Sequence, residues 1–95
     1  MELAGTLKTL FACFTSGERM KEEDWVALEA TLDEERNGFV ARLRAGNHHV
    51  SETDIRICMT KELGLTWRQM AVVFFLAPES VRKRYQRLKK TIFAQ

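Results

Sequence analysis

The chain has 95 residues, of which 45% are hydrophobic and one is proline, so it can form one hydrophobic core and is too apolar for an intrinsically disordered protein. No apolar run reaches the length of a membrane-spanning helix, and the first residues lack the organisation of a signal peptide. We therefore expect one domain in the cytoplasm, with no membrane partner.

The net charge is only +2, but the charges are unevenly distributed. Residues 1–65 contain 8 Lys and Arg against 12 Asp and Glu, a net charge of −4. Residues 66–95 contain 7 against 1, Glu79, a net charge of +6. A concentrated basic segment attracts polyanions through its local field. A solvated helix face is the simpler explanation, but it leaves the near-absence of acidic residues unexplained, since surface helices commonly pair opposite charges.

Residues 1–20 are predicted to form an N-terminal helix and a linker. An apolar residue recurs with the 4-3-4 spacing of a coiled-coil seam at Leu3, Leu7, Leu10 and Phe14. A seam of less than two heptads is too short to be stable alone. The helix either docks on the domain's own core or provides a dimer contact, and the pattern favours neither.

Residues 21–95 are predicted to form one helical domain. It begins with two helices, one from about Glu23 to the Asn37-Gly38 pair and a shorter one that closes at Gly46. In both helices apolar residues recur at helical spacing and define the side that faces the core. These residues are Trp25, Leu28, Leu32, Phe39 and Leu43.

Histidines and cysteines are few. His48 and His49 are adjacent in a polar loop, where their side chains point apart with no other ligand nearby, so we expect no metal site. Cys13 and Cys58 have neither metal-ligand spacing nor the density of a disulfide framework, and Cys58 is expected in the core. Without a nucleophile–base pair or a phosphate-binding glycine loop, we expect neither an enzyme nor a cofactor.

A three-helix unit is predicted over residues 51–92, which makes the fold class all-α. Ser51 is the N-cap of its first helix, Asp54 stands at the capping-box position, and Gly64 is the C-terminal stop. The residues expected to face inward are Ile55, Cys58, Met59 and Leu63.

The second helix of this unit is predicted over residues 67–75. Thr66 is its N-cap, and Gln69 completes a capping box. Ala71 is a small residue where two helices must cross closely, and Val81, ten residues later, returns the next helix to the core. Many helix-turn-helix units share this spacing.

The third helix is predicted from Pro78 to Ile92, because proline suits the first helical turn, where its missing N–H is not needed. Its core side carries residues at i, i+4, i+7 and i+11, namely Val81, Tyr85, Leu88 and Ile92. The remaining surface is basic and polar, with Arg82, Lys83, Gln86, Arg87, Lys89 and Lys90. Two helices joined by a short turn, the second with a basic outer face, predict a helix-turn-helix.

Residues 51–92 resemble the LuxR/GerE-type helix-turn-helix of bacterial transcriptional regulators. The matching residues are SETDIRIC at 51–58, LGLT at 63–66, Met70-Ala71, PESV at 78–81 and RLKK at 87–90. Residues 24–92 are also similar to a subgroup found at the C-terminus of larger regulators, through Asp24-Trp25, Phe39, Arg42-Leu43 and the same RLKK. The resemblance implies sequence-specific binding of double-stranded DNA, usually as a homodimer, in transcriptional regulation.

The resemblance also implies roles for individual residues, with the helix from Pro78 to Ile92 as recognition helix in the major groove. The positions that reach base edges are Arg82, Lys83 and Gln86. The positions near phosphates are Thr66, Trp67, Arg68, Arg87 and Lys90. The side-chain chemistry suits these roles, because arginine and lysine donate to guanine and glutamine pairs with adenine.

The sequence departs from the family pattern at three places. Ala77 replaces the usual serine cap, and Phe75 stands where the family is commonly polar. The family's short fourth helix, often the dimer contact, has no clear counterpart after Ile92. We therefore expect dimer or partner contacts elsewhere, at Leu3, Leu7, Leu10, Phe14 and Phe75.

Two other functions remain open from the sequence. A region-four-like domain of a sigma factor also uses a basic helix-turn-helix and binds RNA polymerase, although no promoter-melting domain is evident. A protein-interaction module would instead use Trp67, Phe74 and Phe75 as anchors, with a merely solvated basic helix. RNA polymerase or an upstream sensor domain is a further expected partner of a regulator.

Overall fold

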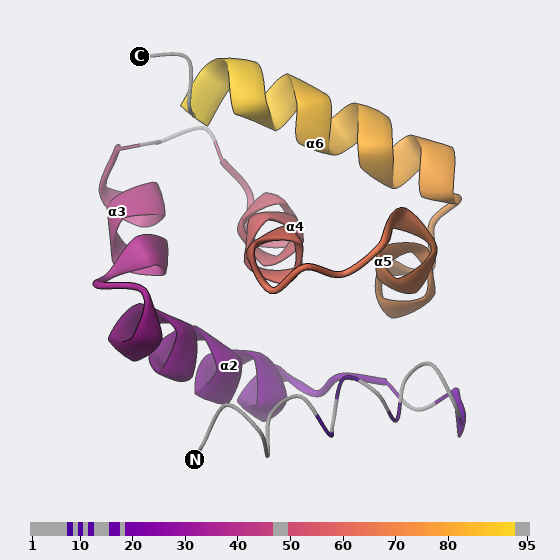
Figure 1. Cartoon of the computed structure of the whole chain (residues 1–95), viewed down its shortest axis with the longest axis horizontal. Helices are drawn as coiled ribbons and strands as arrows, with labels where there is room; N and C mark the ends of the chain where they lie inside the picture. The colour runs from indigo at the N-terminus through magenta and orange to yellow at the C-terminus, as the bar shows by residue number, and fades with distance from the viewer. Residues whose placement is uncertain are drawn as a thin grey trace.

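A computed structural model of the chain describes residues 8, 10, 12, 16, 17, 19–46 and 50–92. For residues 91 and 92 it describes the backbone only. Five helices and no strand lie in this part of the chain, so the predicted all-α fold is confirmed (Figure 1). They are α2 (Glu22–Glu35), α3 (Phe39–Gly46), α4 (Glu52–Glu62), α5 (Trp67–Phe74) and α6 (Pro78–Ile92). None of the described helices is long and apolar enough to cross a bilayer.

The helices surround α4. Helix α6 packs against both α4 and α5, and α2 packs against α3 and α4. In Figure 1, α6 therefore runs along one side of the molecule, and α2 lies on the opposite side of α4 and α5. This arrangement leaves the side of α6 that faces away from α4 and α5 at the surface of the domain.

Both predicted capping boxes are present. The Ser51 hydroxyl accepts from the Asp54 N–H at 3.1 Å, and the Asp54 carboxylate accepts from the Ser51 N–H at 3.2 Å. The Thr66 hydroxyl accepts from the Gln69 N–H at 3.1 Å, and Gln69 Oε1 accepts from the Thr66 N–H at 2.9 Å. Each box satisfies two backbone donors that a helix start leaves open, which fixes where α4 and α5 begin.

The end of α4 also follows the prediction. Gly64 has a φ of +88°, a left-handed conformation that glycine adopts without a Cβ penalty. The Leu65 N–H then donates to the Thr60 carbonyl at 3.2 Å, and the Leu65 side chain is buried. The chain thus reverses over α4 and directs α5 back beside it.

The predicted core residues whose side chains the structure describes are buried or partly buried. Those fully in the core are Trp25, Leu28, Leu32, Leu43, Ile55, Cys58, Met59, Val81 and Leu88, whereas Phe39, Leu63 and Tyr85 are partly buried against it. Burial raises the pKa of the Cys58 thiol to about 11, so the thiol stays protonated and unreactive at neutral pH.

The first twenty residues are described only in part. Leu10 is 1% exposed and belongs to the domain's own core, as one of the two interpretations of the N-terminal seam predicts. The other predicted contact residues of this segment, Leu3, Leu7 and Phe14, lie outside the described residues, as do Cys13, His48 and His49 and the side chain of Ile92.

Polar contacts join α2, α3 and α4. Asp33 Oδ1 accepts from the N–H groups of Val40 and Ala41, at 2.6 and 3.2 Å, so the last turn of α2 caps the start of α3. Arg44 of α3 donates from Nη2 to Glu29 of α2 at 2.6 Å and from Nη1 to Glu52 of α4 at 2.5 Å. Hydrogen bonds with Glu52 and then Glu29 raise the pKa of Arg44.

Candidate nucleic-acid interface

The outward side of α6 carries a polar stripe. Lys83, Gln86 and Lys90 are spaced by three and four residues, so they lie one above another on the helix, and all three are exposed. The buried residues Val81 and Leu88 point the opposite way into the core. The amphipathic pattern of α6 therefore determines which side of the helix is buried and which side is exposed.

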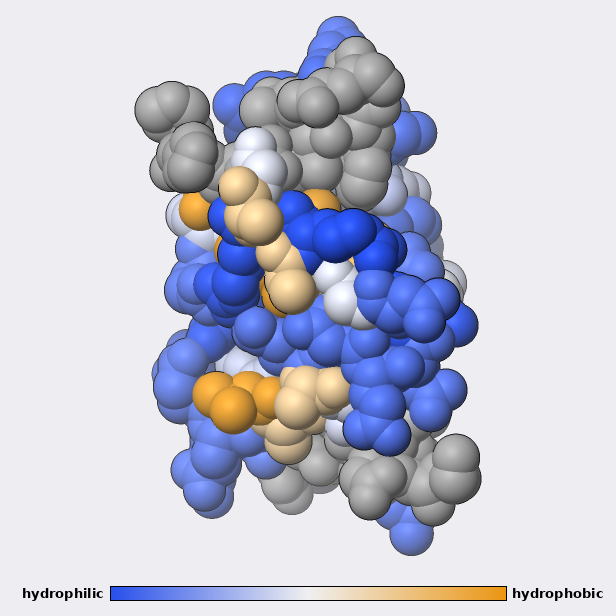
Figure 2. Space-filling model, turned by 90° about the vertical axis from the view of Figure 1, so that its left-hand side faces the viewer, coloured by the Kyte–Doolittle hydropathy of each residue, from blue (hydrophilic) through white to orange (hydrophobic). Residues whose placement is uncertain are grey.

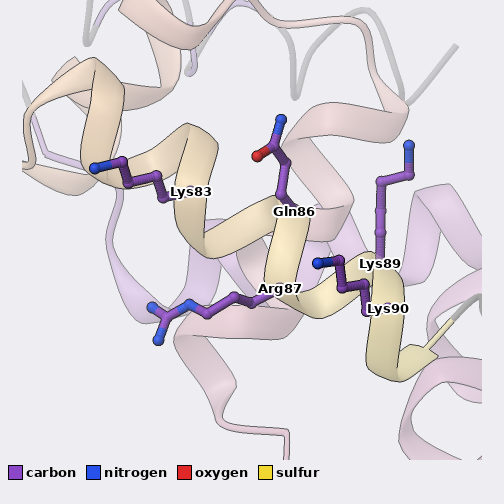
Figure 3. Close-up of a pocket in the computed structure, with 5 residues that line it drawn as sticks. All are labelled: Lys83, Gln86, Arg87, Lys89 and Lys90. Atoms are coloured by element: carbon purple, nitrogen blue, oxygen red, sulfur yellow. The ribbon is translucent and has the colours of Figure 1, made fainter.

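A surface hollow of about 550 Å³ follows this stripe. Among the described residues it is lined by α6 alone, through Lys83, Gln86, Arg87, Lys89 and Lys90. In Figure 3 these side chains project in different directions from successive turns of α6. Four of the five side chains are basic and long, which suits an extended polyanion better than a small enclosed ligand.

Charges of opposite sign lie on opposite sides of the domain. Helix α6 contains six basic residues and one acidic residue, Glu79, whereas α2 contains seven acidic residues and no basic one. Since α4 and α5 separate these helices (Figure 1), a polyanion is attracted to the α6 side and repelled from the α2 side. The +2 net charge of the chain hides this polarity.

The side of the molecule on which α3 lies is mainly hydrophilic. Figure 2 shows it as a largely blue surface with small separate hydrophobic areas. Contiguous apolar patches of several hundred Å² are the usual sign of a protein-binding face. Among the described residues seen from this side, no such broad patch is present.

Arg82 lies on the flank of the stripe and is held by Glu79. Its Nε donates to Glu79 Oε1 at 3.1 Å, and its Nη2 donates to Glu79 Oε2 in the same two-pronged pair. The hydrogen bond from Arg82 lowers the pKa of Glu79, so the carboxylate stays charged at neutral pH. Arg82, which the sequence assigned to a base edge, therefore occupies an ion pair on its own helix.

Arg84 lies on the other flank and joins α6 to α4. Its Nε donates to Asp54 Oδ1 at 2.7 Å, and its Nη2 lies 3.4 Å from the Ser51 hydroxyl. Sequence reasoning missed this contact, because the partners are thirty residues apart. The available signal was the position of Arg84 around the helix, about 60° from the buried Val81 at 100° per residue, which places it beside the core side of α6.

The residues at the start of α5 that are predicted to contact phosphates differ in their exposure and in their contacts. Thr66 uses its hydroxyl to cap α5, and Arg68 is exposed. Trp67 is partly buried, with its ring 5.6 Å from that of Tyr85 and the Lys61 ammonium 3.9 Å from its centre. The hollow thus joins Lys83, Gln86, Arg87 and Lys90, but none of the predicted residues of α5 lines it.

The aromatic residues predicted to anchor a protein-interaction surface differ in how far they are buried. Phe74 stacks on Trp25 at 5.7 Å and is partly buried, so it contributes to folding. Phe75 is 62% exposed, and the guanidinium of Arg19 lies 4.5 Å above its ring. Helix α5 ends at Phe74, and Phe75 begins the turn with a φ of +55°, one residue earlier than the sequence predicts.

The apolar stretch before the turn is only partly covered. Met70, Ala71 and Val73 of α5 are buried. Exposed apolar residues remain at Val72 (46%), Phe75 (62%) and Leu76 (37%). We name these three exposed residues the turn patch.

No group of three His, Cys, Asp or Glu side chains among the described residues could hold a metal ion. Comparisons of the chain with protein-family models, with curated proteins and with solved structures found no match. The geometry and charge of α6 are therefore the features from which a function can be inferred.

Proposed function

We propose that the protein binds double-stranded DNA, with α6 as the recognition helix in the major groove, and that this binding regulates transcription. The observation that carries the proposal is the exposed stripe of Lys83, Gln86 and Lys90 opposite the buried side of α6. The major groove is about 12 Å wide and admits one α-helix, provided that the helix projects from its domain. The resemblance of residues 51–92 to regulator domains points to the same function.

Different residues of α6 serve affinity and sequence reading. Lys90 and Arg87 neutralise phosphates, and the release of counterions gives affinity for any duplex. Lys83 donates to guanine O6 or N7, and Gln86 pairs with adenine N6 and N7 at the groove floor. On α5, exposed Arg68 lies at the helix start, where backbone N–H groups favour a phosphate.

The test is the salt dependence of duplex binding, measured by fluorescence anisotropy on a labelled duplex selected from a random pool. Replacing Lys90 by glutamine removes one cation that neutralises a phosphate, so the slope of log K against log salt should flatten by about 0.9. Lys21→Gln is the matched control, since this exposed lysine precedes α2 on the other side of the domain. The proposal fails if the wild-type protein binds no duplex at low salt, or if the α6 variant and the control bind equally.

Protein–protein contact at the turn patch is a second candidate function. Phe75 exposes 62% of its surface while its backbone is held in the left-handed region, an unfavourable combination for an aromatic side chain. A homodimer contact there accounts for the exposure. Sedimentation of the wild type and of Phe75→Asn tests it, because the contact predicts that the variant shifts toward monomer and the absence of any shift contradicts it.

A further inference from the structure

Glu79 differs from every other charged residue of α6. It is the one acidic residue of that helix, and it lies one turn before Lys83 on the same outward stripe. Its side chain is 58% exposed, and both of its oxygens bind the guanidinium of Arg82. A carboxylate at this place faces whatever the stripe binds.

The pair changes the electrostatic properties of the outward side of α6. Carboxylates engage two arginines that flank the stripe, since Arg82 pairs with Glu79 and Arg84 pairs with Asp54. The Arg84 pair joins two helices, whereas the Arg82 pair links residues three apart on one helix and joins α6 to no other element. Folding therefore does not require Glu79 for tertiary contact, although an acid in the first turn favours the helix dipole.

We propose that Glu79 is a positioning residue that lowers the affinity of α6 for duplexes of arbitrary sequence by holding Arg82, and so raises the selectivity of binding. This inference rests on the proposed function. On a sequence that offers no acceptor to Arg82, the guanidinium stays with Glu79 and contributes no phosphate contact. On a sequence with guanine in reach, the paired O6 and N7 acceptors match the planar guanidinium and replace the carboxylate.

Electrostatic repulsion between Glu79 and the DNA phosphates also lowers the affinity for duplexes of arbitrary sequence. The Glu79 carboxylate is charged at neutral pH, and a negative charge next to the phosphate backbone weakens every complex. Only the complex in which Arg82 finds a new partner compensates for that repulsion. Selectivity achieved by weakening the wrong complexes is a general device of specific binding.

The experiment compares the selected duplex with a random duplex over a range of salt concentrations, using Glu79→Gln. We expect this variant to bind random duplex about 3-fold more tightly, to steepen the salt slope by about 0.9, and to lose selectivity. Glu34→Gln is the matched control, because it removes one exposed acid from α2. In the Arg82→Gln background, the effect of Glu79→Gln on the slope should fall below half, since Glu79 acts through Arg82.

A second variant guards against a misfolded helix. Arg82→Lys retains the charge but cannot form the two-pronged pair, so it should also lose selectivity, with circular dichroism unchanged. If the wild-type protein binds duplex in a salt-dependent manner but Glu79→Gln behaves as Glu34→Gln does, this inference is wrong and the proposed function stands. If the wild-type protein binds no duplex, both are wrong.

Discussion

Arg84 donates from Nε to Asp54 Oδ1 over 2.7 Å and thereby joins α6 to the first turn of α4. Asp54 also accepts from the Ser51 N–H, so one carboxylate both caps α4 and anchors α6. The side chain of Asp54 is 16% exposed and that of Arg84 33%, so the pair is partly shielded from water. Together with buried Val81 and Leu88, it sets the rotation of α6 that turns the polar stripe outward.

Loss of this pair should destabilise the domain in a pH-dependent way. Burial raises the pKa of Asp54, but hydrogen bonds from Arg84 and Ser51 outweigh it and lower the pKa below its usual value. A lowered folded-state pKa means that the stabilisation is complete above the unfolded-state pKa of about 3.9 and is lost as pH falls through the lower folded-state value. Asp54→Asn should therefore cost about 1–2 kcal/mol at neutral pH.

Urea unfolding of wild type and Asp54→Asn at pH 7 and at several values below pH 4 measures this difference. The free-energy gap should shrink as the pH falls, because the wild-type carboxylate becomes protonated too. Glu34→Gln, an exposed change on α2, should stay within about 0.5 kcal/mol of wild type. A gap that is constant over the whole pH range would show that the charge of Asp54 contributes nothing.

The backbone conformation of Phe75 predicts an unusual order of stability among variants at this position. Its φ of +55° lies in the left-handed region, which asparagine tolerates and β-branched residues do not. Phe75→Val should be about 1–2 kcal/mol less stable than Phe75→Asn, although valine is the more apolar residue. Thermal unfolding of the two variants compares them directly, and equal melting temperatures would contradict the conformation of this turn.

The ion pairs of Arg44 should stabilise the packing of α2, α3 and α4. Arg44→Met retains most of the aliphatic stem but leaves Glu29 and Glu52 without their common partner. Since these side chains are partly accessible to solvent, we expect a loss of about 1 kcal/mol that decreases at high salt. The free energy of unfolding at low and at 1 M salt measures it, and a loss that is independent of salt would assign the effect to packing.

Local patterns in the sequence predicted most of the fold. The two capping boxes fixed the starts of α4 and α5, and Gly64 fixed the reversal between them, because each depends on residues within a few positions. The turn after α5 was misplaced by one residue. Phenylalanine rarely adopts a positive φ, so no propensity argument would have put Phe75 at that position.

The candidate site was harder to predict than the fold. Helical periodicity correctly separates the outward Lys83, Gln86 and Lys90 from the buried Val81 and Leu88. It cannot say which basic side chains already have a carboxylate partner. The Arg84 pair bridges two helices, and the Arg82 pair depends on side-chain rotamers, so neither ion pair could be predicted from helical periodicity.

We propose that the polar stripe of α6, which faces outward, binds duplex DNA. Chemical-shift mapping of backbone and side-chain amides during titration with a selected duplex tests it most directly. We predict that the largest changes fall on residues 82–90, including the Gln86 side-chain amide, and that α2 is nearly unaffected. Changes concentrated on α2 or on the turn patch, with α6 unperturbed, would contradict it.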